Sequence, residues 1–275
     1  MNIEQITILA ILTLPPVLGW IIFWRKRLVE PEPTHVLVQL FLFGVLSAAP
    51  LLFLRGYLEG HPDLNFLSWI TSPLALIILL AFLEEAFKDL LLITGVEINK
   101  SHFDKWEDGF EFATLIALGF AFTENILYFW QEYAAGGLAL SFWWLYFFRS
   151  LGTMLGHIIF TGTFGYFYAC AYVAKGLVPK EKHEKPLARF LRNLSWVLRR
   201  PLHITFCHLL PRKDSAKGHT SGEVIIEGFL LAVLLHAVFN SLFYFTPAGK
   251  SLGFLTVPIL VGGGWWYAKR FVKKA

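Results

Sequence analysis

The chain has 275 residues, of which 56% are hydrophobic, 17% aromatic and only 16% charged. Soluble globular domains carry about 25% charged residues, so this composition excludes an ordinary soluble protein. Two cysteines without a CxxC pair exclude a disulfide framework and a thiolate metal site, and the net charge of +4 does not predict a nucleic-acid partner, because the basic residues follow a membrane topology.

Seven apolar segments are long enough to cross a bilayer, which requires about 20 residues. They cover residues 3–24, 35–54, 73–94, 109–130, 142–174, 222–245 and 252–268. The fifth segment is longer than a bilayer requires, so we expect it to tilt or to begin outside the membrane. The sequence therefore predicts an all-α, polytopic membrane helix bundle in which residues 1–275 form one integral membrane domain.

The basic residues predict the orientation of the bundle. With the Arg25-Lys26-Arg27 cluster in the cytoplasm, 20 of the 24 lysines and arginines fall on that side: five before residue 106, eleven in residues 175–217 and four in residues 269–274. The outer loops hold only Arg55 and Lys250. This asymmetry follows the positive-inside rule. We therefore expect a multi-pass protein of the cell membrane, surrounded by lipid, with its N-terminus outside and its C-terminus inside.

The loop at residues 175–221 is the largest segment outside the predicted spans, and we expect it to be cytoplasmic. Apolar residues recur in it at helical spacing among several arginines, which is typical of an amphipathic helix on the inner leaflet. A loosely structured basic loop fits the same residues. The apolar positions are Leu187, Phe190, Leu191, Leu194, Val197 and Leu198.

The third predicted span carries charged residues at membrane depth. Ser72 and Pro73 form a helix-starting pair, and Gly95 fits the position after the helix ends. A helix over residues 73–94 places Glu84 and Glu85 near its middle. Alternatively, the helix begins near residue 66 and the charges lie at its cytoplasmic end.

A charged side chain at the bilayer centre costs roughly 2.5–3.5 kcal/mol on the insertion scale. Lys88 follows Glu84 by four residues, in the order that favours an ion pair on a helix. Glu85 lies about 100° round the helix from Glu84, so the spacing predicts that Glu84 pairs with Lys88 and that Glu85 faces elsewhere.

The fourth and fifth spans carry further polar side chains. Glu124 and Asn125 adjoin in an aromatic stretch, where they indicate either a site or a structural hydrogen-bonded pair. Arg149 lies near the outer end of the fifth span and His157 lies deeper. Glycines on both sides of His157 favour close packing against neighbouring helices, which would point this histidine into the bundle.

The sixth span places His236 and Asn240 on one helical face, at spacing i, i+4. Four spans that each carry ionisable or amide groups at membrane depth predict one shared polar cavity opening within the bilayer. Carboxylates, histidines and an amide can together supply a base, a proton donor and an oxyanion partner.

These residues resemble the motifs of PrsW-type membrane proteases. Residues 84–88 match EExxK, and residues 120–125 match FAxxEN. Arg149 with residues 157–165 is similar to the third element of the family, and residues 236–240 match HxxxN. The resemblance covers roughly residues 73–245, which we take as the catalytic core. EExxK alone is a weak signal, whereas four elements in order are a specific one.

The resemblance implies an intramembrane endopeptidase that cuts a membrane protein, such as an anti-sigma factor, with a glutamate-activated water. The same superfamily includes CAAX prenyl proteases and bacteriocin self-immunity proteins, which use EExxxR, FxxxH and HxxxN. Here Lys88 lies one residue closer, and Glu124 replaces a histidine. The prenyl-protease substrate therefore does not carry over.

By this resemblance, the base is Glu84 or Glu85, with Glu84 preferred as the first glutamate of the motif. A Glu84–Lys88 pair would argue for Glu85 instead. The histidines would assist, and the amide of Asn240 would steady the oxyanion. The predicted catalytic residues are Glu84, Glu85, His157, His236 and Asn240, supported by Lys88, Glu124, Asn125 and Arg149.

Three alternatives remain at this stage. A divalent metal held by glutamate and histidine is compatible with the sequence but not favoured, because HExxH and dense His/Cys spacing are absent, so no cofactor is expected. The chain could instead be a non-catalytic scaffold or self-immunity protein of the same superfamily. A transporter with a midplane site is the third reading, although we find no internal repeat.

Overall fold

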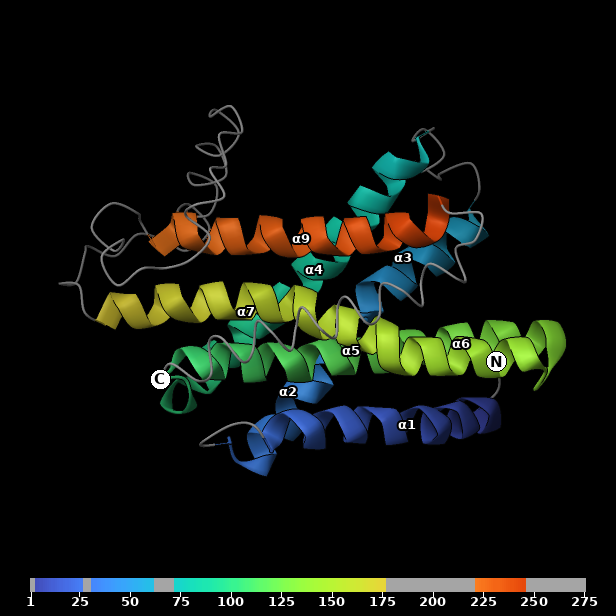
Figure 1. Cartoon of the computed structure of the whole chain (residues 1–275), viewed down its shortest axis with the longest axis horizontal. Coiled ribbons are helices and arrows are strands. Elements are labelled where there is room, and N and C mark those ends of the chain that lie inside the picture. Colours follow the sequence, from blue (N-terminus) through green and yellow to red (C-terminus); the bar gives the residue numbers. More distant parts are fainter. Residues whose placement is uncertain (1–2, 27–30, 62–71, 177–220, 246–275) are drawn as a thin grey trace.

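A computed structural model describes residues 3–26, 31–61, 72–176 and 221–245 of the chain, and in these ranges the regular secondary structure is entirely helical. Figure 1 shows α1, α5, α7 and α9 running side by side along the long axis, with α4 crossing them obliquely. The α-helices are α1 (Ile3–Arg25), α2 (Thr34–Ser47), α3 (Ala49–Gly60), α4 (Pro73–Ile98), α5 (Trp106–Gly136), α6 (Leu140–Phe148), α7 (Met154–Gly176) and α9 (Ser221–Phe245).

The all-α prediction is confirmed for the described residues. Four stretches are long and apolar enough to cross a membrane: Ile3–Arg25, Thr34–Leu54, Trp106–Gly136 and Gly222–Tyr244. The predicted seventh span, 252–268, and nearly all of the loop at residues 175–221 lie outside the described residues. The number of seven spans and the orientation of the bundle stay predictions.

Helix α4 begins as the sequence predicts and ends later. The Ser72 hydroxyl accepts a hydrogen bond from the Ala75 amide, and Pro73 is the first helical residue. The charged residues lie near the middle of this 26-residue helix. The prediction that Gly95 follows the helix was wrong. Gly95 lies inside α4, where an added Cβ would come within 2.6 Å of the Leu40 side chain. The glycine therefore permits close packing between α2 and α4.

Two predicted spans are interrupted. The second divides into α2 and α3 at Ala48, because Pro50 has no N–H to donate to the Leu46 carbonyl. The fifth divides into α6 and α7, joined by the π-helical turn η4 (Arg149–Thr153). Arg149 is therefore on a π-turn between two helices. Such turns are frequent at functional sites.

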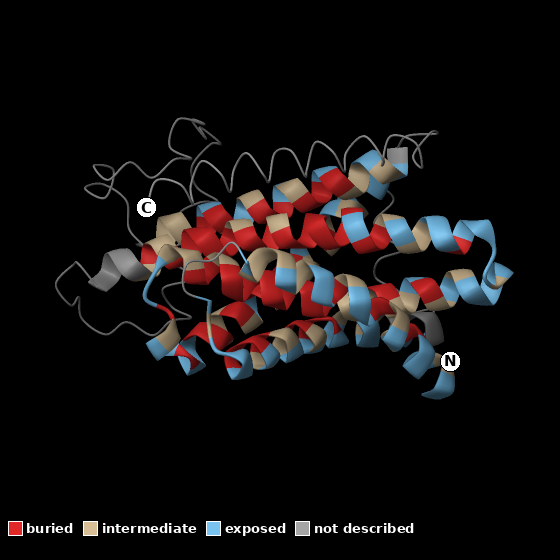
Figure 2. Ribbon diagram, turned by 60° about the horizontal axis from the view of Figure 1, so that its bottom comes forward, coloured by how far each residue is buried: buried red, intermediate tan, exposed pale blue. Residues whose placement is uncertain are grey.

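Helix α5 is the centre of the packing, with α1, α2, α4 and α7 against it. Its N-terminal half, from Asp108 to Ala121, is almost continuously buried. At Gly109 and Gly165 the backbones of α5 and α7 touch so closely that a Cβ on either glycine would collide with the other chain segment. In Figure 2 the buried residues lie where the helices meet. Outward-facing positions such as Ile11, Leu42 and Phe147 are apolar and exposed, as lipid contact requires.

Candidate active site

Polar side chains from four helices and the π-turn meet between the helices, and we call this group the central cluster. Most of its members are buried, and the most exposed side chain, that of Glu124, keeps only 19% of its surface accessible. The sequence predicted that Glu84 or Glu85 would converge with Glu124, His157 and His236. The cluster consists of Glu84, Glu85, Lys88, Glu124, Asn125, Arg149, His157, Thr161 and His236.

Glu85 is at the centre of the cluster, and both of its carboxylate oxygens are occupied. Oε1 accepts hydrogen bonds from Lys88 Nζ at 2.5 Å and from His236 Nδ1 at 2.6 Å. Oε2 accepts a hydrogen bond from the Thr161 hydroxyl at 3.0 Å. The side chain is fully buried. Glu85 therefore joins α4 to α7 and α9, and each of its oxygens already accepts at least one hydrogen bond.

The predicted ion pair between Glu84 and Lys88 was wrong, because Lys88 pairs with Glu85 at spacing i, i+3. Lys88 Nζ also lies 3.2 Å from His157 Nδ1 and 4.6 Å from the centre of the Phe120 ring. These partners come from α5 and α7, on the side of α4 that Glu85 faces. A fully buried ammonium needs several partners at once, and only this side supplies them.

Arg149 fixes Glu124, and Glu124 in turn holds His157. The arginine donates from Nη2 to Glu124 Oε2 and from Nε to Asn125 Oδ1, each at 2.7 Å, and its guanidinium lies 3.8 Å from the centre of the Tyr128 ring. Glu124 Oε2 also lies 3.1 Å from His157 Nε2. The π-turn brings the arginine to this position, which its place in the sequence alone did not indicate.

The two histidines have assignable proton positions. Because Lys88 donates to His157 Nδ1, the proton of this neutral ring lies on Nε2 and faces Glu124. His236 Nδ1 lies 2.6 Å from Glu85 Oε1, and in a neutral ring that donates this hydrogen bond Nε2 carries the lone pair. That lone pair faces Glu84 Oε2 at 3.5 Å, and this oxygen is buried without a hydrogen-bond partner among the described residues.

Sequence comparison decides the family. The family described as PrsW family intramembrane metalloprotease matches residues 32–206, well over half of the chain. The chain belongs to the PrsW family.

Three relatives of the PrsW family show how far the likeness extends. Protease PrsW of Bacillus subtilis (strain 168) is 33% identical over 109 residues, covering 38% of this chain and 46% of the relative. Protease PrsW of Geobacillus kaustophilus (strain HTA426) is 28% identical over 152 residues, covering 55% of this chain and 61% of the relative. Protease PrsW of Clostridioides difficile (strain 630) is 28% identical over 185 residues, covering 65% of this chain and 68% of the relative. The chain thus spans about half to two thirds of the length of these relatives. No solved structure gives a significant match.

The PrsW family description names a metalloprotease, whereas the sequence did not favour a metal. The side chains do fit a cation. Glu84, His157 and His236 each offer a ligand atom, and these atoms lie within 4.8 Å of one another. The buried carboxylates in and beside the cluster outnumber the buried cations by two. The carboxylates are Glu84, Glu85, Asp89 and Glu124, and the cations are Lys88 and Arg149.

The structure also shows where the remaining motif residue, Asn240, lies, and it adds three residues that the sequence did not predict. Asn240 is half-buried and lies one turn beyond His236, and both residues lie past the end of the family match at residue 206. Thr161, a member of the cluster, and Phe120, which contacts it, were not predicted as site residues. The sequence could have indicated Thr161, because it follows His157 by one helical turn. Asp89 is buried with both carboxylate oxygens unpartnered among the described residues.

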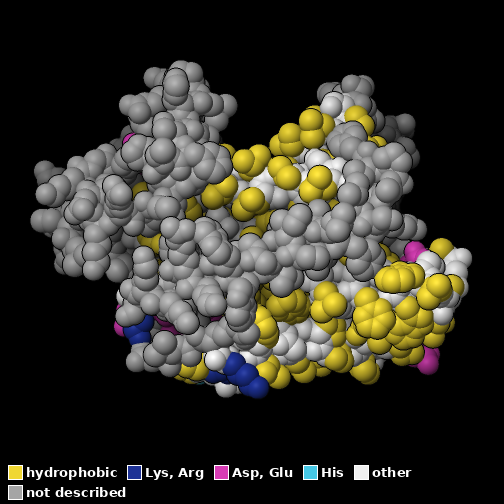
Figure 3. Space-filling view, in the orientation of Figure 1, with side chains coloured by type: hydrophobic (Ala, Val, Ile, Leu, Met, Phe, Trp, Pro, Cys, Tyr) yellow, Lys and Arg dark blue, Asp and Glu magenta, His cyan; other side chains and the backbone are white. Residues whose placement is uncertain are grey.

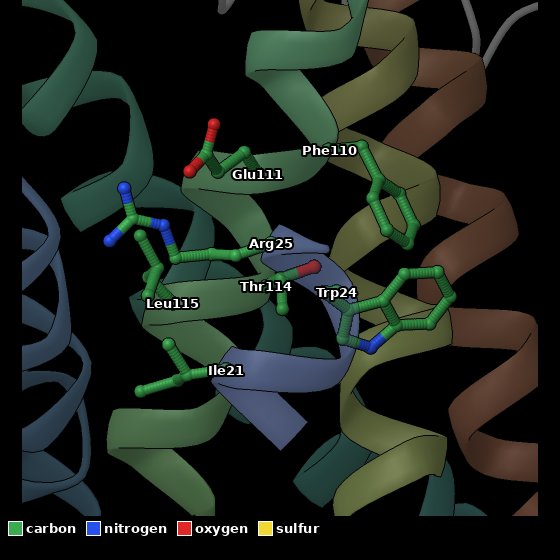
Figure 4. Close-up of a pocket in the computed structure, with 7 residues that line it drawn as sticks. All are labelled: Ile21, Trp24, Arg25, Phe110, Glu111, Thr114 and Leu115. Atoms are coloured by element: carbon green, nitrogen blue, oxygen red, sulfur yellow. The ribbon is translucent and has the colours of Figure 1, made fainter. Parts of the chain in front are cut away.

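A second polar group, which we call the loop-end group, lies where the α1–α2 and α4–α5 connections meet. Arg25 Nη2 donates to the Glu32 carbonyl at 2.9 Å, and the Glu32 amide lies 3.4 Å from both Glu111 oxygens. His102 pairs with the Glu32 side chain at 2.8 Å. Burial and the nearby Asp108 carboxylate raise the pKa of Glu32. Figure 4 shows Arg25 and Glu111 beside a small pocket that Trp24 and Phe110 also line.

Proposed function

We propose that this PrsW-family chain is an intramembrane endopeptidase. It hydrolyses a peptide bond in or near the membrane segment of a membrane protein, such as an anti-sigma-factor-like substrate. The observation that carries the proposal is the unpartnered Oε2 of Glu84, which faces the lone pair of His236 between membrane helices. Membership of the PrsW family and the relatives named Protease PrsW support the same activity.

Glu84 is the reactive carboxylate in this proposal. It accepts a proton from a water molecule, whose oxygen attacks the carbonyl carbon of the substrate. The carbon–nitrogen bond then breaks, and the proton passes from Glu84 to the leaving amine. No covalent bond to the chain forms. A positioned general base of this kind contributes about 10²–10⁴-fold to a rate. Glu84 is preferred to Glu85 as the base, because both oxygens of Glu85 already accept hydrogen bonds.

The remaining cluster residues hold this pair in place. Glu85 fixes the orientation and tautomer of His236 through Nδ1, and Lys88 neutralises Glu85. Glu124 does the same for His157 through Nε2, and Arg149 neutralises Glu124. Each histidine therefore has a carboxylate behind it, which is the arrangement that orients metal-binding histidines.

Glu84, His157 and His236 would hold a divalent metal if the chain uses one. A bound metal would polarise the peptide carbonyl and lower the pKa of a bound water. In that form Glu84 would serve as a ligand with the two histidines, and Lys88 would still neutralise Glu85. The same residues are required in either form.

Co-expression with a library of tagged single-span membrane proteins tests the activity. Wild type is compared with Glu84→Gln and with the matched control Glu111→Gln, which alters a buried glutamate of the loop-end group. We expect the wild type and Glu111→Gln to cleave the same library members and Glu84→Gln to cleave none. A wild type that is expressed and folded but cleaves no member would favour the non-catalytic scaffold.

The metal content of purified protein tests the cofactor separately. With a metal, we expect about one divalent ion per wild-type chain, and much less in His236→Gln at unchanged helix content. Full cleavage in a strong chelator, with no metal bound, would leave Glu84 as the base and exclude the metal form.

A further inference from the structure

An open groove separates the first turns of α4 from the last half of α9, and we call it the α4–α9 groove. It offers about 430 Å³ of space to an occupant. Figure 1 shows that the first turns of α4 diverge from α9, and Figure 3 shows hydrophobic side chains on the surface over these two helices. Its lining includes Leu74 and Ile78 from α4 and Leu234, Ala237, Val238 and Leu242 from α9.

The groove offers apolar contact and no spare hydrogen bond. Leu234 and Val238 are about half exposed in it, while the small side chain of Ala237 is buried. Ser241 is the only polar residue of the lining, and its hydroxyl donates to the Ala237 carbonyl at 2.7 Å. An occupant must therefore satisfy its own backbone, which in a membrane means a helix with an apolar surface.

The groove leads to the candidate catalytic pair. His236 precedes the groove residue Ala237, and Glu84 follows Ile78 by six residues, or about 9 Å along the helix axis. At Glu84 and His236 the two helices come together, with 3.5 Å between the facing atoms. Glu84 also keeps 16% of its side chain exposed, whereas Glu85 keeps none.

We infer that the α4–α9 groove is the docking site for the apolar transmembrane helix of a substrate. This inference rests on the proposed function and adds where the substrate lies. The helix packs along the groove over about two turns, because residues 234–242 rise about 12 Å. Its backbone unwinds where the groove closes, next to Glu84, and the scissile bond lies at that end of the apolar stretch.

Photo-cross-linking tests the docking without requiring cleavage. The full chain carries a benzophenone amino acid at position 238, or at position 38 as the matched control. Both are valines about half exposed on lipid-facing helices. The probe is a biotinylated Leu/Ala-rich transmembrane peptide in phosphatidylcholine liposomes. A purely apolar peptide is a fair probe because the described residues that line the groove include no charged group. We expect at least about fivefold more cross-linked peptide from position 238.

Equal yields from the two positions would overturn the inference. So would a cross-link from position 238 into residues 246–275 of the same chain or into a second copy, since either would identify another occupant. Val238→Trp and Val38→Trp provide the second measurement, on a library member that the wild type cleaves. We expect Val238→Trp to lower kcat/KM at least about tenfold, mainly through KM, and Val38→Trp to leave it within twofold.

The two failures are distinguishable. Selective cross-linking at position 238 without cleavage of any library member would refute the proposed function and keep the groove as a helix-binding surface. Cleavage by the wild type, with equal cross-linking and equal rates in the two tryptophan variants, would refute the groove and keep the protease.

Discussion

The central cluster and the loop-end group contain the same kinds of side chain, namely glutamates, an arginine and histidine, yet they differ in how these are satisfied. In the loop-end group, Arg25 and Glu111 bond to the backbone of Glu32, and the His102 side chain is 31% exposed. In the central cluster the bonds join side chains of different helices, and Lys88 and Glu85 have no exposed surface.

The difference lies in access to water. Partly exposed groups at helix ends, such as His102, can exchange protein partners for solvent, so the loss of one partner there costs little. Groups between membrane helices have no such substitute, and a free atom such as Glu84 Oε2 then indicates a site for a ligand or a proton. Composition alone would not separate the two regions. The following predictions test whether they differ in the way the contacts indicate.

The largest effect is expected for loss of the free carboxylate. Glu84→Gln should lower the cleavage rate of a reporter substrate about 10²–10⁴-fold, because it removes a general base or ligand while keeping the shape of the side chain. Glu111→Gln should change the rate less than threefold. The rates are measured in detergent or liposomes, with circular dichroism as a check on folding. Equal rates for the two variants would remove the functional distinction between the regions.

The second effect concerns stability. Glu85→Gln leaves the Lys88 ammonium buried without its anion and should cost about 3–5 kcal/mol of unfolding free energy. The double variant Glu85→Gln/Lys88→Met should recover most of this stability, because both charges are then gone, but it should recover no activity. Unfolding in mixed micelles measures both variants. A Glu85→Gln protein as stable as wild type would show that the pair is not a structural link.

A smaller effect is expected for Arg149→Lys. Lysine keeps the charge but not the fork that reaches Glu124 and Asn125 together, so Glu124 orients His157 less well. We expect kcat/KM to fall about 10–100-fold, as is usual when a residue behind a functional histidine is altered. The pH profile should change with it, while the melting temperature should move less than in Glu85→Gln. Arg25→Lys, the loop-end counterpart, should stay within twofold.

The smallest effect is a pH dependence in the loop-end group. The pKa of Glu32 is raised in the folded chain, by burial first and by Asp108 second. The folded state therefore holds its proton to higher pH than the unfolded state, so this group lowers stability as pH rises from its ordinary pKa through the raised one. Glu32→Gln should flatten that slope. Melting temperatures across this range measure it, and a slope unchanged by the substitution would contradict the assignment.

Several features could be predicted from local sequence, because they depend on neighbouring residues only. The helical spans follow from hydropathy, the start of α4 from Ser72 and Pro73, and the mid-helix position of Glu84 and Glu85 from that start. The motif order predicted the family, which the comparison shows. The breaks at Ala48 and at the π-turn were missed, since each depends on backbone hydrogen bonds that the hydropathy pattern does not report.

The sequence by itself determined that the chain is a membrane protein, and it predicted that four of its spans carry polar groups. It could not choose the partner of Lys88, because residues three and four positions away on a helix are both within reach. Only the tertiary structure decided this. His236 and Thr161 approach α4 on the side of Glu85, and the buried carboxylate that accepts from these two holds Lys88 as well. That choice leaves Glu84 Oε2 without a hydrogen-bond partner among the described residues, because all three donors bond to Glu85 instead.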